Sequence, residues 1–154
     1  NPFVTSTIEV IKSMGDVSEL KAEALRLLQN PEDLKVDISG AVAIVAEKFR
    51  GTLTISFPKD VFLKIANKYL NQNATELVPE NEGAITEFLN IVVTKATPIL
   101  AASNLEIHRA IPNVIKGDGH LLVGQTKNKV IMIPFQSSVG PFWMTIMMNR
   151  FPGL

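Results

Sequence analysis

Residues 36 to 57, VDISGAVAIVAEKFRGTLTISF, decide the fold class, because two runs rich in β-branched side chains flank a turn near Arg50-Gly51. Such runs predict two antiparallel strands joined as a hairpin. Gly40 lies inside the first run, and a glycine in a strand interior often marks a bend or a bulge. We therefore expect an antiparallel sheet with an irregularity at Gly40.

The residues before the hairpin carry helical patterns. Apolar side chains recur at helical spacing up to Gly15, which predicts a first helix. Residues 17 to 29, VSELKAEALRLLQ, are rich in helix formers, so periodicity favours a second helix there. The alternation of Leu20, Ala22 and Ala24 fits a strand as well.

Two more helices are expected after the hairpin. Ser56 fits an N-cap and Pro58 fits a first helical turn, so a helix is predicted from there to about Asn71. The longest helical pattern covers residues 79 to 103. Pro98 is expected to kink this helix, because its ring removes a backbone hydrogen bond and crowds the preceding turn.

The last third of the chain predicts strands again. Four runs rich in branched and aromatic side chains are separated by the turns GDG, TKNK and SSVG. The runs are IHRAIPNVI (107–115), HLLVGQ (120–125), KVIMIPF (129–135) and FWMTIMM (142–148). Because strands and helices do not alternate regularly, we expect an α+β fold with an antiparallel sheet packed against helices, and no doubly wound parallel sheet.

Composition narrows the class of protein. The 154 residues, 46% of them hydrophobic, suffice for one core, so a single domain over residues 1–154 is expected. Fifteen Lys and Arg balance fifteen Asp and Glu, which is not the charge pattern of a nucleic-acid binder. There is no cysteine, and no apolar run approaches the ~20 residues of a membrane helix. We expect a soluble, cytoplasmic protein with no nucleic-acid or membrane partner.

The helix around TEFLNIVVTKA, residues 86 to 96, raises the question of function. The apolar residues that share one face of it are Ile85, Phe88, Leu89, Val92, Ala96, Ile99 and Leu100. The residues on the opposite face are Gly83, Glu87, Asn90 and Thr94. Ile91 and Val93 are expected to flank this polar strip with apolar surface, which suits docking to another protein. Chance alone supplies about 0.7 Glu-x-x-Asn pairs in a chain of this composition, so the spacing by itself is not specific.

At these residues the sequence resembles the CheX branch of the CheC/CheX/FliY chemotaxis phosphatases. The similar segments are NPFVTSTIEVIKSM, DISGAVAIVAEKFRGTLTISFPKDVFLKIANKYL, EFLNIVVTKA, IPNVIKGDGHLLV, KVIMIPF and the final strand. The resemblance implies a CheC-like fold with a long surface helix that carries Glu-x-x-Asn. It also implies extended structure in part of residues 17 to 29, and this overrides the helix favoured by periodicity.

The resemblance further implies an activity. In that family the Glu-x-x-Asn pair removes the phosphoryl group from the aspartate of a CheY-like response regulator. Carried onto this sequence, Glu87 would dock to the partner's lysine and Asn90 would position the attacking water. No cofactor is implied in this chain, whereas Mg²⁺ is expected in the partner receiver domain. A homodimer with strands joined across chains is also implied, and the low charged fraction of 19% agrees with it.

Some positions depart from the family pattern. The residues expected to contact the receiver are Gly83, Glu87, Ile91 and Thr94. An Asp or Ser is usual at the position of Gly83, and a Gly is usual at the position of Thr94. On the first helix, Glu9-Val10-Ile11-Lys12 corresponds to a second copy of the motif but lacks its Asn. One active site per chain is therefore expected.

Other functions stay open at this stage. His108, Asp118 and His120 could bind a metal, but they lack ligand-pair spacing, and surface histidines are the stronger interpretation by roughly five to one. The sequence has no cysteine nucleophile, nucleophile-elbow serine or phosphate-binding glycine loop. A CheX-like module that binds a receiver without accelerating hydrolysis, or a purely structural dimerisation domain, would explain the same residues.

Overall fold

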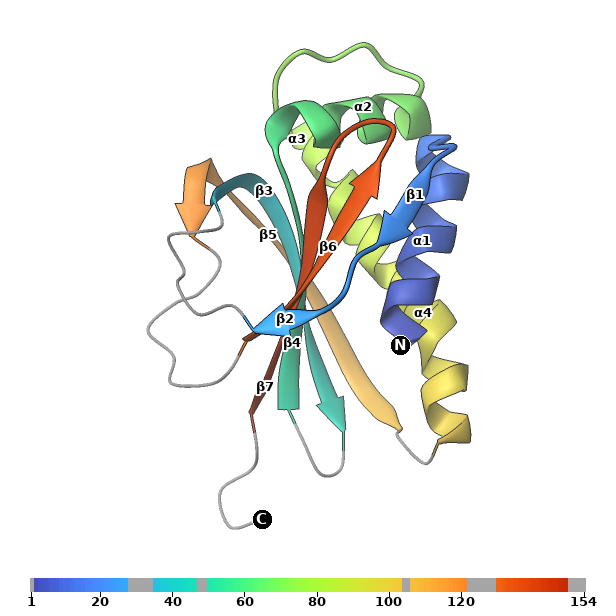
Figure 1. Cartoon of the computed structure of the whole chain (residues 1–154). Helices are drawn as coiled ribbons and strands as arrows, with labels where there is room; N and C mark the ends of the chain where they lie inside the picture. Colours follow the sequence, from blue (N-terminus) through green and yellow to red (C-terminus); the bar gives the residue numbers. More distant parts are fainter. Residues whose placement is uncertain (1, 28–34, 47–49, 104–105, 122–129, 150–154) are drawn as a thin grey trace.

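An antiparallel sheet forms the centre of the fold, and helices pack against one of its faces (Figure 1). The computed structural model describes residues 2–27, 35–46, 50–103, 106–121 and 130–149. Within these residues the strands are β1 (Leu20–Ala22), β2 (Arg26–Leu27), β3 (Lys35–Ala46), β4 (Arg50–Phe57), β5 (Ile107–Leu121), β6 (Val130–Ser137) and β7 (Phe142–Asn149). Their order is β1-β6-β7-β4-β3-β5, and β2 also pairs with β6. The predicted α+β class with an antiparallel sheet is confirmed.

The predicted hairpin is β3 and β4, which pair in continuous register from Ile38↔Phe57 to Val45↔Arg50. Alternate side chains of both strands point toward the helices and are buried, as a half-covered sheet requires. On the opposite face the hydroxyls of Ser39 and Ser56 hydrogen-bond to each other at 2.8 Å. The sequence predicts this pairing of two antiparallel strands, and the structure confirms it.

Gly40 does not produce the expected bulge. Its pairing with Ile55 of β4 and with Val114 of β5 is regular. A Cβ atom at this position would lie 2.7 Å from Cδ1 of Leu89 and 2.9 Å from Cγ1 of Ile85, both on the helix above. The glycine is required because that helix lies directly on the strand.

The helices are α1 (Pro2–Gly15), α2 (Lys59–Leu70), α3 (Pro79–Glu82) and α4 (Ala84–Ala102). Figure 1 shows α1 and α4 side by side along the sheet, with α2 and α3 across one end. Gly83 joins α3 to α4 in helical conformation, with φ −61° and ψ −22°. The long predicted helix is therefore present, with a joint near its start, and it runs through Pro98 to Ala102.

The start of α2 differs from the prediction. Ser56 is not its N-cap, because β4 continues through Phe57 and Pro58 occupies the capping position. The backbone N–H of Lys59 donates instead to Oδ2 of Asp37 on β3, at 2.8 Å. The cap thus comes from a strand about twenty residues earlier, which local sequence patterns do not reveal.

The described part of residues 17 to 29 contains the short strands β1 and β2 and no helix. The helix favoured by periodicity is therefore wrong, and the extended structure that the family resemblance implies for part of the segment is confirmed. β1 pairs with β6 through Leu20↔Ser137, and β2 pairs with the same strand through Arg26↔Met132. Strand pairing with β6 outweighs the helix propensity of this segment.

The turn predicted at GDG is also absent, because β5 continues through residues 117 to 119 as one strand. Lys116 pairs with Ile38 and His120 pairs with Val36, so β5 advances four residues while β3 advances two. The GDG sequence thus forms an irregularity in the strand, which glycine accommodates readily. The predicted strand end at 122–125 and the TKNK turn lie outside the described residues, whereas the SSVG turn between β6 and β7 is present.

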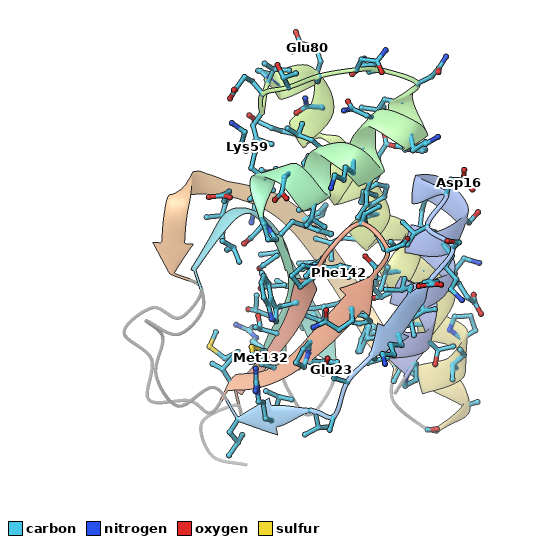
Figure 2. All side chains as sticks on the ribbon, turned by 45° about the horizontal axis from the view of Figure 1, so that its top comes forward. Asp16, Glu23, Lys59, Glu80, Met132 and Phe142 are labelled. Carbon is cyan, nitrogen blue, oxygen red and sulfur yellow. The ribbon has the colours of Figure 1, made fainter. Side chains whose placement is uncertain are left out.

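The main core lies between the sheet and the helices. Phe142 stacks on Phe57 and Phe135, with ring centroids 5.0 and 4.8 Å apart, and Figure 2 shows it among the inward side chains. Met132, with Trp143 packed against it, belongs to a small separate cluster. Because neighbouring residues of a strand point to opposite faces, Trp143 lies on the side of the sheet away from the helices.

The segment Pro79–Ala102 is long and apolar enough to cross a membrane by length and composition alone, with a mean hydropathy of 1.3. In the fold its apolar side chains Ile85, Phe88, Leu89 and Val92 are fully buried against the core. The hydropathy of the segment is that of a helix that covers a sheet. Ile99, expected on the buried face, is 50% exposed instead. The buried residues in the last turns of α4 are Ala96 and Leu100.

Candidate functional site

The outer face of α4 carries the polar strip that the sequence predicted. Gly83, Glu87, Asn90 and Thr94 are all exposed, and they lie along one side of the helix. The adjacent residues Phe88 and Leu89 are fully buried. The helix therefore holds its polar side chains outward on a backbone that is fixed from below.

The borders of the strip differ in part from the expectation. Ile91 is half-buried and packs against the core, so it contributes some apolar surface beside the strip. Val93 is only 7% exposed, so its predicted role as a second apolar flank is wrong. Lys95 of α4, one turn after Ile91 and on the same side of the helix, lies 3.7 Å from Glu9 of α1 in an exposed ion pair.

The first turn of α4 is open at Gly83. A Cβ atom added there would meet no atom within 4 Å, so no contact requires a glycine. Its carbonyl accepts a 2.8 Å hydrogen bond from the hydroxyl of Thr86 and a longer one, 3.4 Å, from the N–H of Glu87. The absence of a side chain keeps this end of the strip low and accessible.

Tyr69, near the end of α2, is part of the site, and the sequence analysis missed it. Its hydroxyl donates a hydrogen bond to Oε2 of Glu87. Its ring packs on Phe88, with centroids 5.6 Å apart and an interplanar angle of 56°. The hydrogen bond to Glu87, followed by burial and the negative charge of that carboxylate, raises the pKa of Tyr69 above its ordinary value. Because the two residues lie on different helices, no spacing rule connects them.

The chain segment after Tyr69 is tied down by amide side chains. Asn71 ends α2 in left-handed conformation at φ 53°, which suits an asparagine. Asn67 brackets Ala74, donating to its carbonyl and accepting from its N–H, each at 3.0 Å. The buried side chain of Asn81 does the same for the N–H of Val78, at 3.1 Å, and the carbonyl of Glu76, at 2.9 Å. These hydrogen bonds order the connection between α2 and α4 that follows Tyr69.

The site is a surface and not an enclosed cavity. One depression is lined by Lys12 with residues 18–21 and 136–137, and another by residues from the ends of α1 and α2. Neither includes Glu87 or Asn90. An exposed strip on a helix suits a protein surface better than a small molecule, which pockets bury almost completely.

No group of three or more His, Asp or Glu side chains that could hold a metal occurs in the part of the chain that the structure describes. The side chains of His108, Asp118 and His120 lie outside that part. On α1, the exposed Glu9 and Lys12 occupy the positions of the incomplete second motif. The site thus combines the carboxylate of Glu87 and the carboxamide of Asn90 on α4 with the hydroxyl of Tyr69 on α2.

Comparisons with known proteins match the chain to a protein family and to solved structures. The family described as "Chemotaxis phosphatase CheX" matches residues 38–136. None of the curated protein sequences is significantly similar to the chain.

Solved structures match almost the whole chain. The chemotaxis protein CheX from Vibrio vulnificus is 29% identical with a TM-score of 0.87, and the match covers 97% of both chains. A CheC-like superfamily protein from Shewanella sp. PV-4 is 28% identical with a TM-score of 0.86, covering 97% of this chain and 96% of that one. The CheX of a CheX–CheY–BeF3–Mg²⁺ complex from Borrelia burgdorferi shares the fold at 17% identity and a TM-score of 0.77, covering 97% and 96%.

Proposed function

Because the chain belongs to the CheX family of chemotaxis phosphatases, we propose that it removes the phosphoryl group from the aspartyl phosphate of a CheY-like response regulator. The observation that carries this proposal is the exposed pair Glu87 and Asn90, one turn apart on the outer face of α4. A carboxylate and a carboxamide on a rigid helix are sufficient for this reaction, for the following reasons.

The substrate places few demands on this chain. An aspartyl phosphate is already an activated acyl phosphate, and a receiver domain contributes a lysine and Mg²⁺ that stabilise the transferring group. The B. burgdorferi relative is in a complex with CheY, Mg²⁺ and BeF3, which stands in for the phosphoryl group. By analogy, the metal belongs to the partner, and this chain supplies a positioned water and a docking contact.

Asn90 supplies the water. Its carboxamide has two N–H donors and one carbonyl acceptor, so it can hold a water in line with the phosphorus while donating to a phosphoryl oxygen. A positioning glutamine has the same task in GTPases, and no strong general base is needed. The buried neighbours Phe88 and Leu89 fix the helix turn from which the amide projects.

Glu87 supplies the docking contact. Its carboxylate can pair with the ammonium group of the receiver's lysine and so fix the register between the two proteins. Gly83, Ile91 and Thr94 line the strip around it and would contact the receiver surface. A side chain at Gly83 would have open space, so the missing family Asp or Ser changes the surface and not the fold.

The proposal is tested by following loss of the phosphoryl group from a purified phosphorylated receiver domain. The wild-type protein is expected to accelerate the loss. Asn90→Ala should lower the rate constant at saturation by roughly 100-fold or more, as removal of a transition-state hydrogen bond does. Glu87→Ala should mainly raise KM for the phosphorylated receiver, by about 10-fold. Glu23→Ala, an exposed glutamate between β1 and β2 and away from the helices, is the matched control and should react like wild type.

The outcome also separates the alternatives. Binding to a BeF3-activated receiver without faster loss of phosphate would mean that the chain is a non-catalytic receiver-binding module. Neither binding nor acceleration with several receivers would leave a structural dimerisation domain. Equal rates for Asn90→Ala and wild type would remove Asn90 from the mechanism, whatever the overall activity.

A further inference from the structure

We propose that Tyr69 is a positioning residue that holds the carboxylate of Glu87 in its docking orientation, with Oε2 bound to the tyrosine hydroxyl and Oε1 presented to the lysine of the receiver. This inference rests on the proposed function and adds a residue from a second helix to its site. The juxtaposition of Tyr69 and Glu87 across α2 and α4 carries the argument.

A glutamate on an exposed helix face normally samples several rotamers. Ordering it when a partner binds costs conformational entropy, and a side chain that is already ordered in the free protein avoids that cost. Glu87 is exposed, and the hydrogen bond from the hydroxyl of Tyr69 restricts its carboxylate. Glu87 is therefore ordered before the receiver arrives.

Tyr69 is suited to this task because it is itself restrained. Its ring packs on the fully buried Phe88, one residue after Glu87. A tyrosine has only two side-chain torsions, so packing of the ring also fixes the position of the hydroxyl. On either side of Tyr69 in the chain, Asn67 bonds to Ala74 and Asn71 caps the end of α2. The donor thus stands on a fixed element and not on a mobile loop.

The hydrogen bond leaves the carboxylate able to bind a cation. A carboxylate has two oxygens, and among the described residues Oε1 of Glu87 has no side-chain donor. Tyr69 is a neutral donor, and the carboxylate beside it raises the pKa of the phenol, so the proton stays on the tyrosine at neutral pH. A lysine or arginine in its place would neutralise Glu87 and weaken the attraction for the receiver's ammonium group.

The expected consequence concerns docking and not the chemical step, since within the described residues the hydroxyl of Tyr69 bonds to Glu87 and not to Asn90. Tyr69→Phe keeps the ring on Phe88 and removes only the hydroxyl. We expect KM for the phosphorylated receiver to rise roughly threefold to tenfold with kcat within about twofold of wild type. Thr7→Val, which removes a hydroxyl that donates to the Phe3 carbonyl within α1, is the matched control and should leave both constants unchanged.

A double-mutant cycle shows whether Tyr69 acts through Glu87. In the Glu87→Ala background, adding Tyr69→Phe should change KM by less than about 1.5-fold. Equal effects of Tyr69→Phe in both backgrounds would overturn the proposal, because the tyrosine would then contact the receiver independently. An unchanged KM in the single variant would overturn it as well.

A spectroscopic measurement tests the contact without activity. Tyr69 is the only tyrosine in the chain, so phenolate absorbance during a pH titration reports this residue alone. Glu87→Ala should lower its pKa toward the ordinary value, and Glu9→Ala should not. An unchanged pKa in Glu87→Ala would contradict the contact even if the phosphatase assay succeeds. Conversely, a shifted pKa in a protein that neither binds nor dephosphorylates a receiver would refute the proposed function and the docking role while leaving the hydrogen bond established.

Discussion

At the residue scale, the protein offers a partner two polar side chains whose backbones are held from inside. Glu87 and Asn90 project from a helix turn whose next residues, Phe88 and Ile91, pack against the core. Because the side chain of Asn90 is exposed, its substitution should change the surface chemistry with little effect on stability, usually within about 0.5 kcal/mol. Function and folding can therefore be separated experimentally at this site.

The Tyr69–Glu87 contact makes the free energy of unfolding depend on pH in the alkaline range. The unfolded phenol loses its proton near pH ~10, whereas the folded one keeps it to higher pH, because its pKa is raised. Between these two values the folded protein binds more protons than the unfolded chain. The contribution to the unfolding free energy is thus complete below about pH 10 and falls as the pH rises through the folded pKa.

The corresponding measurement is urea unfolding of wild type and Tyr69→Phe at about pH 8 and about pH 11. Wild type should be the more stable protein at the lower pH, and the difference between them should shrink at the higher pH. Thr7→Val serves as the control, since its difference from wild type should not change with pH. A Tyr69→Phe difference that stays constant would show that the phenol does not titrate with folding.

How far the sequence predicts the site depends on whether a residue's role is local. The periodicity of α4 predicts that Glu87 and Asn90 face outward, because a helix that covers a sheet must bury its apolar side. The same periodicity fails for Val93 and Ile99, whose burial depends on how far neighbouring elements reach over α4. Tyr69 could not be predicted at all, because its contact with Glu87 exists only after two helices have packed.

At the scale of elements, one glycine allows α4 to pack closely on the sheet. Gly40 lets the helix rest on β3, where a methyl group would lie 2.7 Å from Leu89 and 2.9 Å from Ile85. Both side chains are fully buried and have little room to move. The height of the functional helix above the sheet is therefore set by a residue on the opposite element.

Two glycine-to-alanine substitutions should have opposite effects. Gly40→Ala should lower the free energy of unfolding by about 1–2 kcal/mol, because crowding outweighs the gain in chain stiffness. Gly83→Ala should raise it by about 0.5–1 kcal/mol, because its backbone is helical and the space is open. Denaturant midpoints at constant slope measure both. If the Gly40→Ala variant were more stable than wild type, α4 would be able to move away from the added methyl group without loss of packing energy.

Elements that depend on neighbours were the least predictable from sequence. The sequence predicts the β3–β4 hairpin because both strands and the turn between them lie within one short stretch of the chain. Residues 17 to 29 have helix propensity but pair with β6, and the GDG sequence is a strand irregularity because β3 continues beside it. In both cases the paired residues lie roughly 80 to 120 positions apart in the chain, and such distant pairing is not contained in local propensity.

At the scale of the whole molecule, one sheet supports everything else. The apolar run FWMTIMM forms β7, which pairs with β4 on one side and β6 on the other. Its composition thus reflects a central position in the sheet. β5 is at one end of the strand order and is the longest described strand, with Val114 37% and Ile115 45% exposed. Membership of a family of soluble chemotaxis signalling proteins is consistent with a cytoplasmic protein.

We propose that the chain forms a homodimer through this edge, because exposed strand edges with apolar side chains pair readily. Sedimentation should give twice the mass of one chain. Ile115→Lys should shift the protein toward monomer, whereas Leu25→Lys, at an exposed leucine on the other side of the sheet order, should not. A monomer at all concentrations would refute the dimer, and an effect of Leu25→Lys alone would assign it to the opposite edge.

The position of Trp143 has a practical consequence. It is the only tryptophan, and the sheet separates it from α4. Its fluorescence should therefore stay constant when a receiver binds the helices and change when another surface covers the far side of the sheet. Emission from this one indole can thus distinguish partners that approach the protein from its two sides, without an added dye.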